Sequence, residues 1–199
     1  MMQNHILDKW TNCRASDREP AAEIVDDFER VLGDSRDERS LQSFLAAFPV
    51  VLGPLAPPGG ALWCLDRPRL GSEFVPDFLL ASATSVGFRW TMVELESPTE
   101  RALTRAGLPA RKLAEALKQV RDWRTWITDN VAYARSELGL RDIEANCPAI
   151  IVIGRRNGLD SKQARTYRAL SSAETTVMTY DRLLDHVRRG GTEKQATYG

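Results

Sequence analysis

The sequence has few of the residues on which metal-stapled and secreted proteins depend. Its 199 residues include three cysteines and two histidines, and Cys13, Cys64 and Cys147 show no CxxC spacing. A zinc site of the usual Cys/His type is therefore not expected. Three cysteines also leave one unpaired in any disulfide scheme, so we expect reduced thiols in a cytoplasmic protein.

The chain also lacks the signals of a membrane or exported protein. No apolar run approaches the ~20 residues that are needed to cross a bilayer. The N-terminal stretch MMQNHILDKW has neither the basic nor the apolar region of a signal peptide. We therefore expect a cytoplasmic protein with no membrane partner.

A net charge of either sign is missing as well. The formal net charge is zero, so no field over the whole protein attracts nucleic acid. The charges are nevertheless segregated: residues 8–38 hold ten acidic and five basic side chains, and residues 101–124 hold seven basic and two acidic ones. The second segment, which includes Arg111 and Lys118, is a candidate nucleic-acid-binding surface. A solvated helix face is the alternative.

Hydrophobic periodicity predicts an α/β fold, a mixed β-sheet flanked by helices. Helical spacing is seen at 19–33, 35–48, 109–130, 161–172 and 181–189, and strand patterns at 61–65, 74–81, 87–96, 147–154 and 176–180. The proline- and glycine-rich segment 53–60 is predicted to be a loop. We expect an N-terminal helical extension at 1–36, one folded domain at 37–190 and a flexible tail at 191–199.

The stretch VELESP, at 93–98, places two acids at the end of the most apolar predicted strand. In a strand, residues i and i+2 face the same side, so Glu94 and Glu96 point together with Met92 and Trp90. Two carboxylates on one buried face repel each other and lose hydration. Something cationic is expected to offset this.

A third acid is predicted to join them. If the hairpin turn is centred between Ser85 and Val86, Asp77 lies directly opposite Glu94 and shares its face. Three carboxylates in one place favour a hard divalent cation such as Mg²⁺, which would neutralise charge on a phosphodiester. Alternatively, these acids pair with arginines such as Arg89 or Arg101.

These residues carry a resemblance. Pro76-Asp77 followed by Glu94-x-Glu96 resembles the PD-(D/E)XK nuclease signature, with glutamate in place of the usual lysine, and the predicted αβββαβ order resembles that restriction-endonuclease-like core. Six stretches in order resemble the Shedu-type nuclease family of bacterial antiphage defence, over roughly residues 37–187. They are DERSLQSFLAAFPVVLG, VPDFLLA, TMVELESP, LKQVRDWRTWI, AIIVIGRR and VMTYDRLL.

The resemblance implies a metal-dependent DNA endonuclease that uses Mg²⁺ or Mn²⁺ and forms a homo-oligomer. Asp77 and Glu94 would bind the metal, Glu38 would complete the site from the preceding helix, and Gln119 would orient water or contact the substrate. A helix-start acid and a solvent-facing polar residue are the respective alternatives for Glu38 and Gln119.

Glu96 is where the sequence departs from the common pattern. A glutamate supplies no positive charge, so it would act as a further metal ligand or as a general base. The missing charge could come from the long helix, through Lys112 or Lys118. Lys112 is seven residues from Gln119 and so lies nearer to its face, and we favour it.

Two further pairs of residues each have more than one interpretation. Arg155 and Arg156 follow a buried strand and could contact phosphates, or could lie in a solvated turn. Trp123 and Trp126 could stack on bases, but the core or a dimer interface is favoured. Two alternatives to the nuclease therefore stay open: an inactive nuclease-fold module that binds nucleic acid or a protein, and an oligomeric scaffold whose acids pair with arginines.

Overall fold

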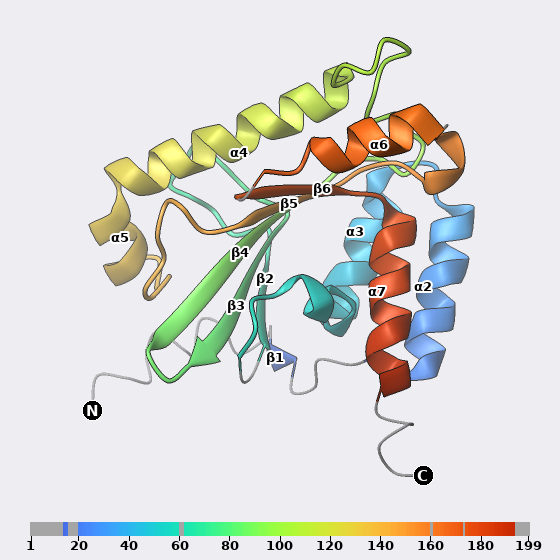
Figure 1. The fold of residues 1–199 in the computed structure, drawn as a ribbon. Helices are drawn as coiled ribbons and strands as arrows, with labels where there is room; N and C mark the ends of the chain where they lie inside the picture. The colour runs from blue at the N-terminus through green and yellow to red at the C-terminus, as the bar shows by residue number, and fades with distance from the viewer. Residues whose placement is uncertain (1–13, 16–19, 60–61, 160, 173, 194–199) are drawn as a thin grey trace.

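The fold is described from a computed structural model that covers residues 14–15, 20–59, 62–159, 161–172 and 174–193 (Figure 1). Most of the predicted extension before residue 20, and the end of the predicted tail at 194–199, lie outside the described residues. No helix among the described residues is long and apolar enough to span a membrane.

The helices and strands follow the predicted order, with short additions. In chain order they are β1 (Arg14–Ala15), α2 (Ala22–Asp34), α3 (Glu38–Ala47), the 3-10 helix η2 (Pro49–Leu55), β2 (Leu62–Asp66), β3 (Phe78–Thr84), β4 (Gly87–Leu95), α4 (Arg111–Asp129), α5 (Val131–Ser136), β5 (Ala149–Val152), the 3-10 turn η3 (Arg156–Gly158), α6 (Ser161–Ala169), β6 (Thr175–Met178) and α7 (Tyr180–Glu193).

The strands form one mixed sheet in the order β1-β2-β3-β4-β5-β6. Neighbours from β1 to β4 are antiparallel, and β4, β5 and β6 are parallel. The predicted fold class, an α/β protein with a mixed sheet flanked by helices, is confirmed. The two-residue strand β1 was not predicted, because so short a segment carries no periodicity.

The register of the β3–β4 hairpin agrees with the prediction. Phe78 pairs with Val93 and Thr84 pairs with Gly87, so the turn is centred between Ser85 and Val86. A turn this short leaves little freedom of register, and a slip by one residue would turn every buried side chain toward the other face. Asp77, directly before β3, therefore lies opposite Glu94.

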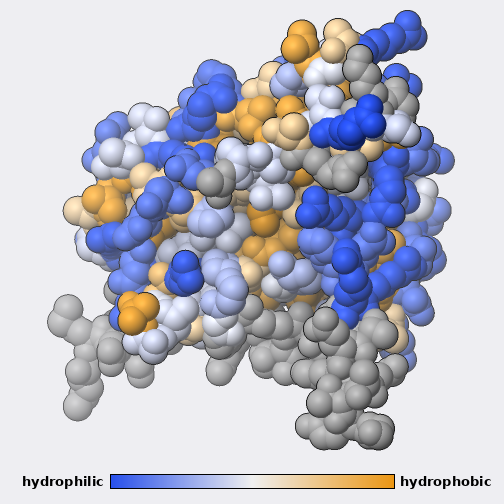
Figure 2. Space-filling model, in the orientation of Figure 1, coloured by the Kyte–Doolittle hydropathy of each residue, from blue (hydrophilic) through white to orange (hydrophobic). Residues whose placement is uncertain are grey.

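Each face of the sheet has its own hydrophobic core (Figure 1). Helices α4, α5 and α6 cover one face, to which β4 contributes Trp90 and Met92. Helices α2, α3 and α7 and the helix η2 cover the other, to which β4 contributes Val93 and Leu95. Hydrophilic residues cover much of the outer surface over α2 and α7, at the right of Figure 2.

Both tryptophans of the long helix belong to the first core. Trp123 is 1% exposed and Trp126 is 8% exposed, so their rings pack under α4 and not against solvent. This placement supports the core reading and leaves little ring surface for stacking on a base.

Three local differences from the predictions have physical reasons. Part of the predicted loop at 53–60 is helical, because Leu52 and Leu55 are buried and pull η2 against the sheet. The short helix α5 was not predicted, because six residues carry too little periodicity. Helix α7 runs to Glu193, beyond residue 190, where we expected the tail to begin.

Candidate active site

Asp77 and Glu94 meet where β3 begins and β4 ends. Asp77 Oδ2 accepts a hydrogen bond from the Leu95 backbone N–H at 2.7 Å, and the Asp77 carbonyl accepts one from the Arg67 N–H at 2.8 Å. The Asp77 and Glu94 carboxyl groups also share a hydrogen bond. Two neighbouring strands therefore hold these two acids side by side.

Glu96 follows β4 directly and is held by its backbone. Its N–H donates to the Val152 carbonyl at 2.9 Å, which continues the parallel ladder, and its carbonyl accepts from the Tyr180 hydroxyl at 2.9 Å. Its carboxylate faces the start of α4, where the Lys112 ammonium lies 3.6 Å from Glu96 Oε2. The Glu96 side chain is 5% exposed and that of Lys112 is 35% exposed, so the ammonium is open to solvent on one side.

Burial and mutual repulsion perturb all three acids. Burial first, and then the charges of Asp77, Glu96 and Glu38, raise the pKa of Glu94 to about 9. Burial also raises the pKa of Asp77, against the opposing effect of the Leu95 N–H. Burial and the neighbouring Asp77 therefore both favour the protonated form of Glu94, because two ionised carboxylates in contact repel each other.

Glu96 has an intermediate environment. Burial raises its pKa to about 7, and the neighbouring Lys112 ammonium opposes that rise. A carboxylate with a pKa near neutrality can accept and release a proton at physiological pH, which is what general-base catalysis requires.

Glu38 lies beside this cluster and faces solvent. It is the first residue of α3, and its charge contributes to the raised pKa values of Asp77, Glu94 and Glu96. The segment before it is tied to the end of β4, because the Ser97 and Thr99 hydroxyls donate to the Arg36 carbonyl at 3.2 and 3.1 Å. We name Asp77, Glu94, Glu96, Glu38 and Lys112 the acidic cluster.

The acidic cluster suits a hard divalent cation by its chemistry. Buried carboxylates that raise one another's pKa would be relieved by a cation, and oxygen donors are the ligands that Mg²⁺ and Mn²⁺ prefer. As the side chains stand, however, no group of three or more His, Cys, Asp or Glu residues in the described chain has an arrangement ready to hold a metal ion. A cation bound to these acids would favour their ionised forms.

The other predicted residues of α4 lie farther along the helix or form ion pairs. Gln119 is half-buried, two turns and about 10 Å along the axis from Lys112. Lys118 Nζ lies 2.6 Å from Asp122 Oδ2, and Arg111 is paired with Glu115 at 2.7 Å, both on the exposed surface. Of the two lysines considered, Lys112 is the one in contact with the acids.

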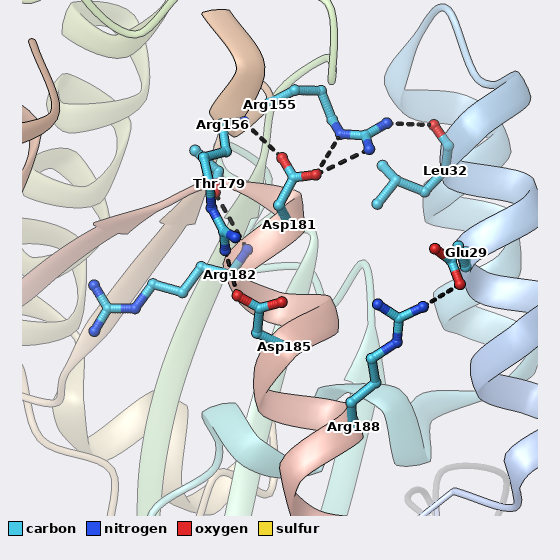
Figure 3. A network of polar contacts seen from close by, with 9 residues as sticks. All are labelled: Glu29, Leu32, Arg155, Arg156, Thr179, Asp181, Arg182, Asp185 and Arg188. Carbon is cyan, nitrogen blue, oxygen red and sulfur yellow. Dashed lines mark hydrogen bonds and ion pairs between the residues drawn. The ribbon is translucent and has the colours of Figure 1, made fainter. Parts of the chain in front are cut away.

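Arg155 and Arg156 belong to a polar network between helices (Figure 3). The Arg155 guanidinium donates to Asp181 Oδ1 and to the Leu32 carbonyl at the end of α2, and Arg156 pairs with Asp185. The same network lowers the pKa of Asp181, against the effect of burial. Both arginines therefore connect the end of β5 to α7, and Arg155 also to α2.

Sequence reasoning missed three residues that support the acidic cluster. Tyr180 is fully buried and donates to Glu96, and Ser97 and Thr99 hold the residues before Glu38. The SPT sequence after VELE is a hydroxyl-rich turn that could have suggested such bonds. Tyr180 gave no comparable signal, because a tyrosine at the end of an apolar strand most often fills the core.

The comparisons with known proteins identify a family for the chain. A family model described as "Shedu protein SduA, C-terminal" matches residues 35–184, which is most of the chain. None of the curated proteins compared with the chain matches it.

Proposed function

Because the chain belongs to the family of the Shedu protein SduA C-terminal region, we propose that it is a metal-dependent DNA endonuclease. Family membership suggests a role in antiphage defence. The observation that carries the enzymatic proposal is the 3.6 Å approach of Lys112 to Glu96, beside the buried Glu94 and the half-buried Asp77. These are the residue types of a phosphodiesterase centre, with the lysine supplied by a helix.

Asp77 and Glu94 are the residues that would hold Mg²⁺ or Mn²⁺, and Glu96 would stay outside the metal's ligands as a base. A divalent cation, when bound, would offset the charge of the phosphodiester and lower the pKa of a coordinated water. Burial and repulsion between the carboxylates raise these pKa values in the metal-free protein, and a bound cation would offset that repulsion.

Glu96 and Lys112 then have complementary roles. The Glu96 carboxylate, with its pKa near 7, would accept a proton from the attacking water. The Lys112 ammonium, beside it and partly exposed, would stabilise the negative charge that develops on the phosphate oxygens. In this proposal two residues share the role of the lysine in the common motif: Glu96, which follows β4, and Lys112, which lies on α4.

DNA cleavage tests the proposal. Supercoiled and linear DNA are incubated with Mg²⁺ or Mn²⁺ and with the wild type, Asp77→Asn or Glu94→Ala. Cleavage is expected with the wild type alone. Cleavage that survives Glu94→Ala would refute the assignment of the site.

Lys112 has a matched control on its own helix. Lys112→Met should lower the cleavage rate by about 10²-fold or more, as expected for loss of a group that stabilises transition-state charge. Lys118→Met should cleave at close to the wild-type rate, because Lys118 is paired with Asp122 on the surface. Equal rates for the two variants would show that Lys112 does not take the place of the motif lysine.

One observation favours a second candidate, an inactive nuclease-fold module that binds nucleic acid or a protein. The described acids are not arranged as a metal site, and Lys112 already neutralises Glu96. Metal-independent DNA binding without cleavage under any metal would support it. DNA as the partner and a homo-oligomeric assembly remain predictions from the family.

A further inference from the structure

A cavity of about 350 Å³ opens at the carboxyl ends of β4 and β5. Its walls are the loop after β4, the loop after β5, helix α6 and the end of α2. The crevice outside the carboxyl ends of strands is where open α/β sheets commonly bind ligands. The volume falls within the range of about 300–1,000 Å³ that small-molecule sites have.

The walls of this cavity are held in place by bonds between loops. Gly154 has φ +68° and approaches the other loop so closely that a Cβ atom would lie 2.4 Å from the Glu100 carbonyl oxygen. Its N–H donates to the Ser97 carbonyl at 3.2 Å. On another side, Arg155 is fixed between Asp181 and Leu32 (Figure 3). These bonds hold the loop after β5 to the loop after β4 and to the end of α2.

The lining changes character from the floor to the rim. Leu103, Ile153 and the ring of Tyr167 provide buried apolar surface, and Asn157 and Gln163 add polar groups. Two exposed arginines, Arg36 and Arg101, form part of the rim.

Neither Arg36 nor Arg101 forms an ion pair with a described residue, unlike Arg155 in the same lining. Glu100 is the one acidic residue that lines the cavity, so Arg36 and Arg101 give the lining an excess of positive charge. An apolar floor with polar groups and a cationic rim suits a flat, partly polar ring system that carries a phosphate.

We propose that this cavity, the rim pocket, seats one nucleotide of a DNA strand, with its base over the floor and its phosphate at Arg36 and Arg101. The proposal rests on the proposed nuclease function for the identity of the strand. Arg36 precedes Glu38 by two residues, and Pro98, also in the lining, follows Glu96 by two. A strand that leaves the pocket at this rim therefore passes the acidic cluster.

The test measures binding of deoxyadenosine 5′-monophosphate to the full-length wild-type chain by calorimetry, in chelator and low salt. Deoxyadenosine and inorganic phosphate are titrated separately, to separate base recognition from simple anion binding. The nucleotide should bind at least tenfold more tightly than either fragment. Because no metal is present and no bond is broken, the result is independent of whether the chain cleaves DNA.

Variants locate the site. Arg36→Gln and Arg101→Gln should each weaken nucleotide binding by about tenfold, as loss of a charge-assisted hydrogen bond does. Glu100→Gln should strengthen it several-fold, because it removes the one acidic group. Arg105→Gln, an exposed arginine of the same loop that is outside the lining, should leave binding unchanged.

Three outcomes would overturn the proposal. They are phosphate binding as tight as nucleotide binding, an equal effect of Arg36→Gln and Arg105→Gln, and absence of nucleotide binding by the wild type. If nucleotide binds as described but DNA is never cleaved, the rim pocket stands and the nuclease proposal fails. If DNA is cleaved and no nucleotide binds, the reverse holds.

Discussion

Replacing Glu94 by glutamine should stabilise the metal-free protein at neutral pH. Glu94 is 7% exposed, and in the folded state burial and the neighbouring acids raise its pKa to about 9 from an ordinary value of 4.5. At pH 7 the unfolded chain carries an ionised Glu94, whereas the folded chain must bind a proton there. Glutamine has no such requirement, and its amide can still donate to Asp77.

The magnitude follows from linkage between protonation and folding. Each pKa unit corresponds to about 1.4 kcal/mol, and pH 7 lies between the unfolded and the folded pKa of Glu94. Proton uptake at pH 7 therefore costs up to about 3 kcal/mol of the free energy of unfolding. Because the folded-state pKa of Glu94 is raised, the contribution of this residue to the free energy of unfolding is fully present below pH 4.5. It is lost as the pH rises toward 9.

Urea denaturation in chelator, at several pH values from 4.5 to 9, measures this difference. Glu94→Gln should match the wild type near pH 4.5 and exceed it progressively at higher pH. Glu73→Gln, at an exposed turn position, should show no such trend. A difference between Glu94→Gln and wild type that does not change with pH would refute the reasoning.

Magnesium should remove most of this difference in stability. A ligand that binds only the folded state adds about 2.7 kcal/mol at a concentration of one hundred times its Kd. The wild type should gain this stabilisation, and Glu94→Gln should gain much less, because it lacks one of the proposed ligands. The acidic cluster would then be a site at which stability is sacrificed for function.

The remaining predictions concern the residues that support the site, and thermal or urea denaturation tests each. Tyr180→Phe should destabilise the fold by about 1–3 kcal/mol, because it removes a buried hydrogen bond to the end of β4. Tyr133→Phe, at a 46% exposed position, should have a much smaller effect. Equal effects of the two substitutions would contradict the reasoning. Gly154→Ala should cost at least about 2 kcal/mol, because it places a Cβ against a carbonyl oxygen at positive φ. Gly33→Ala, at a helical position with open space around it, should instead stabilise the fold by about 0.5–1 kcal/mol. If both glycine substitutions changed the free energy of unfolding in the same direction, this reasoning would be wrong.

Local rules were enough to predict the geometry of the β3–β4 hairpin and hence the meeting of Asp77 with Glu94. Strand alternation is readable from the sequence, whereas the turn centre between Ser85 and Val86 was an assumption that the register of the hairpin then met. The choice of Lys112 over Lys118 also followed from helical spacing, once Gln119 was taken as the reference face.

Contacts between distant segments were not readable in this way. Arg155 and Arg156 were given two interpretations, phosphate contact or a solvated turn, and neither indicated their partner Asp181, which lies on α7, 26 and 25 residues away. The hydrogen bond from Tyr180 to Glu96 spans 84 residues. Such pairs depend on how β5, β6 and α7 pack, and periodicity within a single element carries no information about that packing.

Titration with Mn²⁺ by calorimetry tests the central claim most directly, that the buried acids hold a catalytic divalent cation. The wild type should bind Mn²⁺ with release of protons, because Glu94 must give up its proton, and Asp77→Asn should abolish this binding. Absence of binding to the wild type, or equal binding to Asp77→Asn, would contradict the account.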